Sequence, residues 1–545
     1  MTGRSDLPRS IDALIVGGGA TGAGLLRDLA LRGLRGLLVD KSDLTSGTSG
    51  RYHGLLHSGA RYVARDVQAA RECIAENRVL RRIAPACIED TGGVFVATPD
   101  DPEDYVAAFA GRCAAAGIPC DEVGLGDLFR REPALNRRIR QAFRVPDASL
   151  EPWQLVEANL ADARSRGSMA LPYRRVVGMT RNGGFISSVA IADTRSDSVQ
   201  QIEPRIIVSA AGAWAGQVAG LAGVHLAMSP GKGTMLVYNQ RMTDTVVNRC
   251  SVPGDGDIMV PVHTVAILGT TDIAVDDPDD TQPTRAEIEQ LLVEGEKLFP
   301  DLRRMRLLRA YAGVRPLYAP AELIRDVGGG DDRAISRAHV VVDHAARDGV
   351  ANFISIVGGK LTTYRLMAEQ TAALVCGRLG VDVACSTADE VLPGQGPDRS
   401  YYWLGDRLAE HEAQGGGDAD LICECEFVTR PMLEGFLAER MPCSLDDVRR
   451  GTRLGMGPCQ GAFCTFRAAG MISAAQASGA DVEAVPGQAV LSDFLAERYR
   501  GTRPIAWGRQ LQELWLATGI YWGSLGLDGA ASPQPLPPGA NDDPG

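Results

Sequence analysis

The stretch IDALIVGGGATGAGLLRDLALRGLRGLLVD, residues 11–40, decides the fold of this chain. Within it an apolar run at 13–16 leads into a glycine-rich turn at 17–22, and a segment with helical periodicity leads to a second apolar run at 37–39. Asp40 ends that run, about 20 residues beyond the turn, where a carboxylate can hydrogen-bond to a ribose hydroxyl. These features in this order indicate a complete βαβ unit.

The residues of the turn have separate tasks in a dinucleotide-binding site. Gly17 allows the tight turn, Gly19 lets the backbone approach a pyrophosphate, and Gly22 lets the helix pack closely on the strand. Ala20 and Thr21 begin the helix, whose first N–H groups can bind phosphate. The stretch therefore predicts that the chain binds a dinucleotide.

Composition and charge narrow the class of protein. The 545 residues suggest several domains, and a hydrophobic content of 45% is enough for large cores. The net charge of −12 argues against nucleic acid, so an anionic substrate would need a local basic pocket. The N-terminus has no apolar signal segment, and no later run approaches the roughly 20 apolar residues of a membrane span. We expect a cytoplasmic protein whose membrane contact is at most peripheral.

The segment 41–62, directly after the βαβ unit, is rich in Gly, Ser and Thr. Beside a dinucleotide site such a loop can offer hydroxyl and backbone N–H groups to phosphates and ring edges, but it can also be an ordinary polar connector. Its basic and aromatic residues are Arg51, His53, His57, Arg61 and Tyr62, with Tyr52 between the first two.

Four of the twelve cysteines form two close pairs late in the chain. One residue separates Cys423 from Cys425, and four residues separate Cys459 from Cys464. Four thiolates of this kind can hold either a tetrahedral zinc ion or an iron–sulfur cluster. Zinc more often uses C-x-x-C pairs. Because the C-x-C spacing resembles the bacterioferritin-associated ferredoxin type of domain, we favour a [2Fe–2S] cluster over zinc.

Several motifs together resemble the flavin-dependent glycerol-3-phosphate dehydrogenases, and most closely the catalytic subunit of the anaerobic bacterial enzyme. They span the chain from Ile11 to about Leu527, and their joint occurrence is specific. The motifs are GGGATG at 17–22, HGLLHSGARY at 53–62, AAGAW at 210–214, LGTTD at 268–272, YAGVRPL at 311–317, SRAHVVVDHAARDG at 336–349, GGKLTTYR at 358–365, CEC at 423–425 and GMGPCQGAFC at 455–464.

The resemblance implies an FAD enzyme that oxidises sn-glycerol 3-phosphate to dihydroxyacetone phosphate. The flavin N5 would accept hydride from the C2–H while a base removes the hydroxyl proton. In this family the electrons pass to electron-transfer and membrane-anchor subunits and then to quinone. The resemblance therefore implies a location at the inner face of the cell membrane, without nucleic acid as a partner.

The resemblance also assigns residues to the substrate phosphate. Arg61 and Tyr62 match the family pair after the His-x-Gly turn, and Arg337 matches the arginine beyond the GVRPL motif. Guanidinium groups suit this task because their planar fork binds two phosphate oxygens at once.

A second group of residues is assigned to the chemistry. His57 is our first choice for the base, because imidazole titrates nearest the working pH. A desolvated Lys360 is the alternative base, and Arg315 and Lys360 would stabilise negative charge by the flavin. Aerobic relatives carry a further histidine where this chain has Thr234 in GKGTM, which argues against a mechanism with a second histidine.

Further contacts to the cofactor are expected from segments far apart in the sequence. Besides the turn and Asp40, the expected residues are Thr45, Ser46, Ser49, Gly59, Val176, Ala211, Gly212, Trp214, Gly313, Gly359, Leu361 and Thr362.

We predict an α/β fold: a glutathione-reductase-like Rossmann domain, an amino-acid-oxidase-like antiparallel substrate domain, and a small cysteine-rich domain with helices. The predicted boundaries are 10–90, 150–222 and 308–385 for the FAD domain, 91–149 and 223–307 for the substrate or cap domain, 386–420 for a linker, 421–475 for the [2Fe–2S] domain, 476–527 for a helical segment and 528–545 for a disordered tail.

Two other functions fit the same residues. One is an FAD oxidase of a related phosphorylated alcohol, hydroxy acid or amino acid that uses oxygen and keeps a structural zinc in its four cysteines. The other is a redox-sensing or assembly protein with a degenerate flavin site, against which the presence of His57, Arg315 and Lys360 argues.

Overall fold

The computed structural model describes residues 7–196, 198–318, 338–396, 401, 403–417, 420–440, 444–477 and 487–521. The chain divides into two compact units, the first formed by Met1–Met305 and Tyr311–Trp403 and the second by Arg306–Ala310 and Leu404–Gly545. The predictions for Arg337 and for the tail 528–545 lie outside the described residues. None of the described helices is long and apolar enough to span a membrane.

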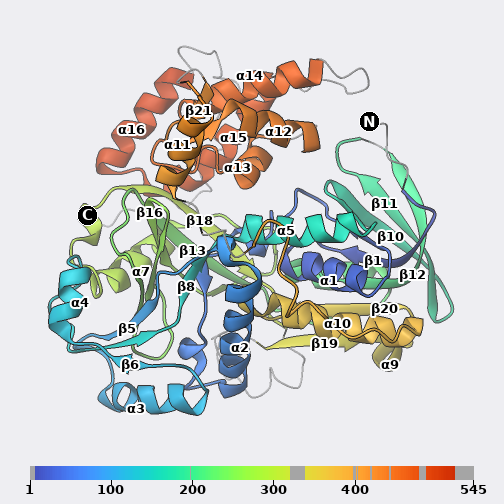
Figure 1. The fold of residues 1–545 in the computed structure, drawn as a ribbon, viewed down its shortest axis with the longest axis horizontal. Coiled ribbons are helices and arrows are strands. Elements are labelled where there is room, and N and C mark those ends of the chain that lie inside the picture. Colours follow the sequence, from blue (N-terminus) through green and yellow to red (C-terminus); the bar gives the residue numbers. More distant parts are fainter. Residues whose placement is uncertain are drawn as a thin grey trace. The chain divides into compact units, whose positions relative to one another are not determined.

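The first unit contains a sheet of eight strands, which lies on the right of the view in Figure 1. Its five parallel strands come from four distant parts of the chain, as predicted for a Rossmann domain built from discontinuous segments. In spatial order they are β9 (Met169–Leu171), β2 (Gly36–Val39), β1 (Ser10–Val16), β12 (Val199–Ser209) and β20 (Phe353–Gly358). Antiparallel neighbours are β19 (His339–Asp343) beside β20, and the hairpin β10 (Arg174–Asn182) and β11 (Phe185–Asp193) beside β12.

Helices cover the parallel sheet, which is why its strands are apolar on both faces. On one side α1 (Ala20–Leu31) packs between α5 (Pro152–Ser165) and α10 (Tyr364–Leu379), and these helices share one core with the sheet (Figure 1). The close approach of α1 to α10 depends on Gly24, because an added Cβ there would lie 2.9 Å from the Tyr364 ring. The opposite face packs against α6 (Ala215–Leu221) and the hairpin.

A second sheet, of nine strands, is built mainly from the predicted cap segments. It also contains Leu307–Arg315, most of which was predicted for the FAD domain, because this segment pairs with the strand Gly231–Tyr238. Its order is β17 (Ile273–Ala274), β13 (Gly231–Tyr238), β16 (Val265–Gly269), β15 (Ile258–Val262), β14 (Val246–Arg249), β5 (Gly93–Ala97), β7 (Gln141–Val145) and β6 (Asp121–Glu122), with β18 (Leu307–Arg315) also paired to β13. The expected antiparallel arrangement needs one correction: β14 and β5 run parallel. The physical reason is that two separate insertions meet at this pair, so no hairpin dictates its direction.

The remaining elements of the first unit surround this sheet. Helix α7 (Arg285–Glu296) begins at a capping box in which Thr284 and Glu287 bond each other's backbone, and α10 ends at Gly380 with φ 72°. The other elements are α2 (Val67–Ile83), α3 (Glu103–Ala115), α4 (Leu125–Arg131), α9 (His344–Asp348) and a small sheet of β3 (Leu55–Leu56), β8 (Ala148–Leu150) and β4 (Ile88–Glu89).

The predicted linker 386–420 has two different parts in the structure. Its first part packs on the first unit, where Leu392 is buried and its N–H donates to the carbonyl of Ile83 (2.9 Å). Its later part contains α11 (Leu404–Ala413) of the second unit. The low apolar content that suggested a linker reflects a surface segment held by polar contacts.

The second unit is mainly helical and has its own core. Residues of the predicted cysteine domain share that core with Val490 and Phe494, which lie in the segment predicted as a separate helical part. The elements are α11, β21 (Leu421–Cys423), β22 (Val428–Thr429), α12 (Arg430–Arg440), α13 (Leu445–Thr452), α14 (Cys464–Ala477), α15 (Gly487–Thr502) and α16 (Gly508–Gly519).

Candidate functional site

The turn between β1 and α1 can be made only by glycine at two positions. Gly17 has φ 118°, and a Cβ there would lie 2.4 Å from the carbonyl oxygen of Ala210. A Cβ on Gly22 would lie 2.0 Å from the carbonyl oxygen of Gly17. The helix N-terminus therefore lies directly against the turn, in the geometry that binds a pyrophosphate.

Asp40 directly follows β2, beside this turn. Its carboxylate accepts the N–H groups of Gly18 (2.7 Å) and Ser42 (2.9 Å), which fix the side chain at the edge of the sheet. Burial raises the pKa of Asp40 to about 6, although the two N–H donors oppose the shift. The carboxylate is thus oriented at the place where a ribose hydroxyl would lie.

The loop after Asp40 folds back over the glycine turn. The hydroxyl of Ser49 accepts the N–H of Ala20 (3.0 Å), and the N–H of Thr45, whose φ is 61°, donates to the carbonyl of Gly18 (3.0 Å). The carbonyl of Ser46 accepts Arg51 Nε (3.0 Å). The structure therefore brings two of the predicted cofactor residues, Thr45 and Ser49, to the predicted phosphate site.

Other predicted cofactor residues occupy tight turns around the same site. Gly212, after Ala211, has φ 55°, Gly59 has φ 95°, and Gly359 has φ 76° with no room for a Cβ beside Met367. Lys41 Nζ lies 4.2 Å above the Trp214 ring, and a Cβ on Gly313 would lie 2.2 Å from the carbonyl oxygen of Arg51. Val176 is buried in β10, two residues beyond Arg174, whose N–H donates to the carbonyl of Asp40 (2.6 Å).

The predicted base lies in a row of aromatic side chains. The ring of His57 is 5.4 Å from Tyr62 and 6.0 Å from His53, measured between centroids. Lys360 Nζ lies 4.6 Å above the Tyr62 ring. The structure therefore gathers both candidate bases, His57 and Lys360, around one tyrosine, although they are about 300 residues apart in the sequence.

Hydrogen bonds join the His57 segment to the turn that carries Lys360. The N–H of His57 donates to Thr362 Oγ1 (3.1 Å) in the short helix Leu361–Thr363. Thr362 is fully buried, so water cannot replace this bond. The bond fixes the backbone of the predicted base against a predicted cofactor turn.

Arg315 is held at the end of β18 by the 270–272 loop. Its Nη1 donates to Asp272 Oδ1 (2.7 Å), and its Nη2 donates to Thr270 Oγ1 (2.5 Å) and the carbonyl of Thr271 (2.8 Å). A Cβ on Gly233 would lie 2.6 Å from Nη2, so the glycine leaves room for the guanidinium. The cation is fixed in position before any substrate arrives.

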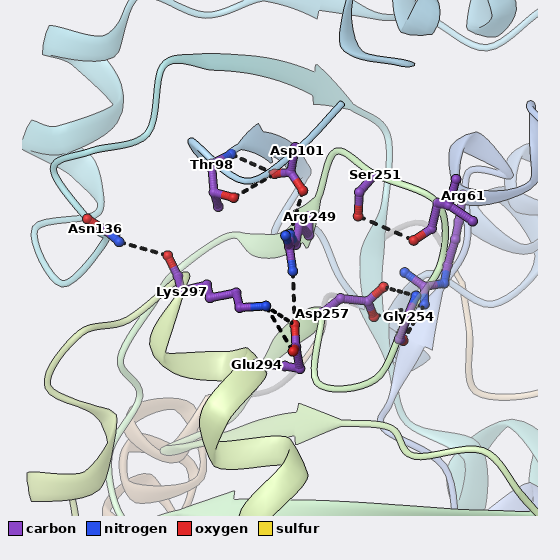
Figure 2. A network of polar contacts seen from close by, with 11 residues as sticks. Arg61, Thr98, Asp101, Asn136, Arg249, Ser251, Gly254, Asp257, Glu294 and Lys297 are labelled. Carbon is purple, nitrogen blue, oxygen red and sulfur yellow. Dashed lines mark hydrogen bonds and ion pairs between the residues drawn. The ribbon is translucent and has the colours of Figure 1, made fainter. Parts of the chain in front are cut away.

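Arg61 forms an ion pair with a buried carboxylate. Figure 2 shows its guanidinium against Asp257, and Nη2 lies 2.8 Å from Oδ1. Burial lowers the pKa of Arg61, but the charge of Asp257, its hydrogen bond to the guanidinium and the nearby tyrosines together outweigh burial, so the net shift is upward. Arg61 therefore fixes the loop that contains Asp257 and Gly254, and its predicted role at the phosphate stays a prediction.

Thr234 faces α7. Its hydroxyl donates to Glu287 Oε1 (2.7 Å), and Lys232 Nζ lies 3.3 Å from the other oxygen of the same carboxylate. Thr271 Oγ1 accepts the N–H of Thr234 (2.9 Å) and belongs to the loop that holds Arg315. The residue that replaces the second histidine thus supports the loop behind Arg315.

The sequence reasoning missed residues that hold this site. His53 is the ring neighbour of His57, and Asp272 is the carboxylate partner of Arg315. Both lie inside the quoted motifs HGLLHSGARY and LGTTD, so motif membership was the available signal. Asn77 and Asp147 lie outside every quoted motif, and only the fold reveals their contacts.

The four cysteines of the second unit come together in one cluster. Their thiols lie within hydrogen-bonding reach in the order Cys423, Cys464, Cys459 and Cys425. A Cβ on Gly457 would lie 2.3 Å from the Cβ of Cys425, so only glycine lets the second loop approach the first. Two distant pairs predicted from spacing therefore form one site.

Backbone N–H groups surround these sulfurs. Those of Gly455 and Glu426 donate to Cys423, and those of Gly461 and Ala462 donate to Cys459. Hydrogen bonds from Cys464 and from these groups lower the pKa of both thiols, which favours the thiolate that a metal needs. Within the described ranges no group of three or more His, Cys, Asp or Glu side chains surrounds a single metal-ion position.

Comparison with known proteins identifies the family. The model of the FAD dependent oxidoreductase family matches residues 12–374. One relative, a component of the anaerobic glycerol-3-phosphate dehydrogenase of Escherichia coli K12, is 41% identical over 541 residues, which cover 95% of this chain and 98% of the relative. Subunit A1 of the anaerobic glycerol-3-phosphate dehydrogenase of Haloferax volcanii is 40% identical over 548 residues, 96% of this chain and 92% of the relative. The chain belongs to the FAD-dependent glycerol-3-phosphate dehydrogenase family.

A solved structure agrees with this family at the level of the fold. The glycerol-3-phosphate dehydrogenase from Bacillus halodurans, complexed with FAD, has a TM-score of 0.64 and 20% identity, covering 90% of this chain and 95% of that one. The chain is thus an FAD-dependent oxidoreductase. The glycine turn, the oriented Asp40 and the loop that bonds Ala20 are the features that fit FAD.

Proposed function

We propose that this chain oxidises sn-glycerol 3-phosphate to dihydroxyacetone phosphate as the catalytic subunit of a quinone-linked enzyme. The observation that carries the proposal is the 41% identity, over 95% of the chain, to a component of an anaerobic glycerol-3-phosphate dehydrogenase. FAD, when bound, supplies the acceptor for the hydride from C2. The side chains of the protein then have to bind the phosphate, move one proton and stabilise charge.

The proton is removed by His57 in this proposal. Its imidazole lies beside Tyr62, and its backbone N–H donates to Thr362; both contacts support this role because they fix the segment that carries the base. Lys360, whose Nζ lies 4.6 Å from the centroid of the same Tyr62 ring, is the alternative base. Arg315, fixed by Asp272, stabilises the negative charge that develops on the substrate oxygen.

The phosphate is bound by Arg61, Tyr62 and Arg337. Arg61 precedes Tyr62 in the short 3-10 helix at Ala60–Tyr62, and in this proposal its guanidinium serves the phosphate while it keeps Asp257 as its partner. The dianion needs such cations because the protein as a whole carries a charge of −12.

The four cysteines hold a [2Fe–2S] cluster in this proposal. Four clustered thiols and the N–H groups donated to their sulfurs are the residues that such a cluster requires. The cluster would pass electrons one at a time to partner subunits, a membrane anchor and quinone, and the chain would lie peripherally at the inner face of the membrane. The relatives are named as single subunits of a larger enzyme, which supports the existence of partners.

The test is an anaerobic titration of the purified protein with sn-glycerol 3-phosphate. Bleaching of the flavin absorbance followed by the paramagnetic signal of a reduced cluster is the expected result. Bleaching with bound zinc and rapid peroxide formation in air would identify an oxidase instead. A flavin that dithionite reduces and the substrate does not would overturn the proposed substrate.

A further inference from the structure

We propose that Asp147 is a positioning residue that holds His57 in its working orientation. The inference rests on the proposed function, because it concerns the base of that reaction. Asp147 lies between β7 and β8, outside every motif that carries the family resemblance. It acts on the reaction only through the backbone of the His57 segment.

The carboxylate of Asp147 is buried and accepts hydrogen bonds from Ser58, through both its backbone N–H and its hydroxyl, and from Asn248. Its Oδ1 accepts the backbone N–H of Ser58 at 2.6 Å, and its Oδ2 accepts the side-chain N–H of Asn248 at 3.1 Å. Asp147 is 2% exposed, and Ser58 and Asn248 are fully buried. Since water cannot take over these bonds, the carboxylate fixes the peptide that directly follows His57.

The side chain of Asp147 fits only because the residue opposite it, Gly93, has no side chain. A Cβ on Gly93 would lie 2.6 Å from the Cβ of Asp147 and 2.9 Å from Oδ2, so glycine is needed opposite it in β5. Asn248 lies in β14, the parallel neighbour of β5. Asp147 therefore joins the substrate-side sheet to the loop of the predicted base.

A second buried side chain holds the other backbone group of His57. Asn77 in α2 donates to the carbonyls of His57 and Pro146, both at 3.1 Å, and Arg81 Nε donates to Asn77 Oδ1 (2.9 Å). Together with the bond from the His57 N–H to Thr362, three consecutive polar groups of this backbone have side-chain partners. Hydrogen bonds therefore fix the backbone on both sides of the His57 Cα, to which the imidazole is attached.

A fixed backbone matters because proton transfer depends on geometry. A displacement of about 1 Å of a catalytic group can cost on the order of 100-fold in rate. Loss of Asp147 would free the Ser58 N–H in a buried place and let the segment shift. The expected consequence is a slow chemical step with unchanged cofactor binding.

The amide isostere separates the hydrogen bond from the charge. In Asp147→Asn one oxygen still accepts the Ser58 N–H, and the new N–H₂ can donate to Asn248 Oδ1, which has no partner among the described residues, once the Asn248 amide turns over. Asp147→Ala removes all of these bonds. Comparison of Asp147→Asn with Asp147→Ala therefore tests whether the hydrogen bonds of this side chain, rather than its charge, hold the His57 segment.

The matched control is Asp101→Asn. Asp101 is 3% exposed and accepts the backbone N–H of Thr98 at 2.6 Å, so it resembles Asp147 in burial and bonding. Figure 2 shows that Asp101 also pairs with Arg249, whose Nε lies 2.6 Å from Asp101 Oδ1. Asp101 thereby stabilises the turn after β5. It has no bond to the His57 segment, so its loss affects stability and leaves the rate of flavin reduction unchanged.

The experiment uses the full-length flavoprotein and two measurements. The first is the rate of flavin reduction at saturating sn-glycerol 3-phosphate without oxygen, normalised to bound FAD. We expect about a 10- to 100-fold loss in Asp147→Ala, recovery to within about 3-fold in Asp147→Asn, and an unchanged rate in Asp101→Asn. The second is hydrogen exchange of the 53–62 peptide without substrate, which we expect to be at least about tenfold faster in Asp147→Ala alone.

The outcomes separate this inference from the proposed function. If the wild-type flavin is not reduced by the substrate, the proposed function fails, and the exchange of the 53–62 peptide still decides whether Asp147 anchors it. A normal rate and normal exchange in Asp147→Ala, or an Asp147→Asn variant as slow as Asp147→Ala, overturns the inference. Should Asp147→Ala fail to bind FAD, Asn248→Ala loosens the same carboxylate, and unchanged exchange and rate in that variant overturn the inference as well.

Discussion

The flavin site of the first unit and the cysteine site of the second are built from the sequence in different ways. The flavin site collects residues from the 17–22 turn, the 40–62 loop and the 311–317 and 358–362 segments. The cysteine site uses two short loops, 423–425 and 455–464. Residue spacing therefore describes the cysteine site almost completely, and it describes only one edge of the flavin site.

This difference indicates which substitutions should disrupt each site. Within the flavin site the glycine turn is a local structure that its own residues impose. The positions of His57 and Arg315 depend on partners more than 40 residues away, such as Asp147 and Asp272. Single substitutions can therefore test whether the glycine turn, and with it FAD binding, is lost independently of the positions of His57 and Arg315.

The largest effect is expected from Gly22→Val. A Cβ at this position would lie 2.0 Å from a backbone carbonyl oxygen, so the turn cannot keep its shape and bound FAD should fall below about a tenth of the wild-type content. Absorbance of the purified protein and its iron content measure the result. Gly377→Ala in α10 is the control: its Cβ would meet open space, and replacing a helical glycine should stabilise the protein by about 0.4–1 kcal/mol. Simultaneous loss of iron in Gly22→Val would contradict the independence of the two sites.

Cys459→Ser tests whether the cysteine site can be lost while the flavin site is kept. Removal of one thiolate should take away most of the bound iron, because the serine hydroxyl is a poor ligand for iron–sulfur clusters. The FAD content and the rate of flavin reduction by substrate should stay within about twofold, since the chemistry is proposed to occur on the first unit. Iron analysis and stopped-flow absorbance measure both, with Cys120→Ser as a control. An unchanged iron content in Cys459→Ser would refute the proposed cluster.

Arg315→Lys tests the long-range part of the flavin site. Lysine offers one ammonium group where the guanidinium bonds Asp272, Thr270 and Thr271, so we expect a rate of flavin reduction lower by roughly 100-fold or more with FAD retained. The control is Arg303→Lys, a surface residue paired with Glu289 and Glu296, which should keep the wild-type rate. Equal rates in the two variants would mean that Arg315 does not stabilise charge in the reaction.

The smallest effect is expected from Asp40→Asn in the apoprotein. Because burial raises the pKa of Asp40 to about 6, the folded protein binds more protons here than the unfolded chain between about pH 4 and pH 6. The contribution of Asp40 to the free energy of unfolding therefore falls as the pH rises through this range. Urea titrations at several pH values should show Asp40→Asn gaining stability relative to wild type from pH 4 to pH 6. A parallel pH dependence of the two proteins would contradict the raised pKa.

Local patterns in the sequence predicted the parts of the molecule that local forces control. The βαβ unit was predicted because apolar runs, a glycine turn and a terminal Asp40 follow one another at fixed spacing, and the structure has β1, α1 and β2 there. Helix α7 likewise begins at Thr284 through local forces, because its capping box uses the nearby residues Thr284 and Glu287. The family followed from motifs, and the comparisons bear it out.

Only the tertiary structure decided the features that depend on partners far along the chain. These are the parallel pairing of β14 with β5, the orientation of Thr234 toward Glu287 and the anchoring of His57 by Asp147. Hydrophobic periodicity predicts whether a residue is buried, but it does not indicate which distant strand or side chain that residue contacts. A buried carboxylate has to be stabilised by specific donors, and those donors are chosen by the packing of whole elements. The sequence by itself therefore determined the cofactor turn and the cysteine pairs, while the fold decided which side chains hold the predicted base in place.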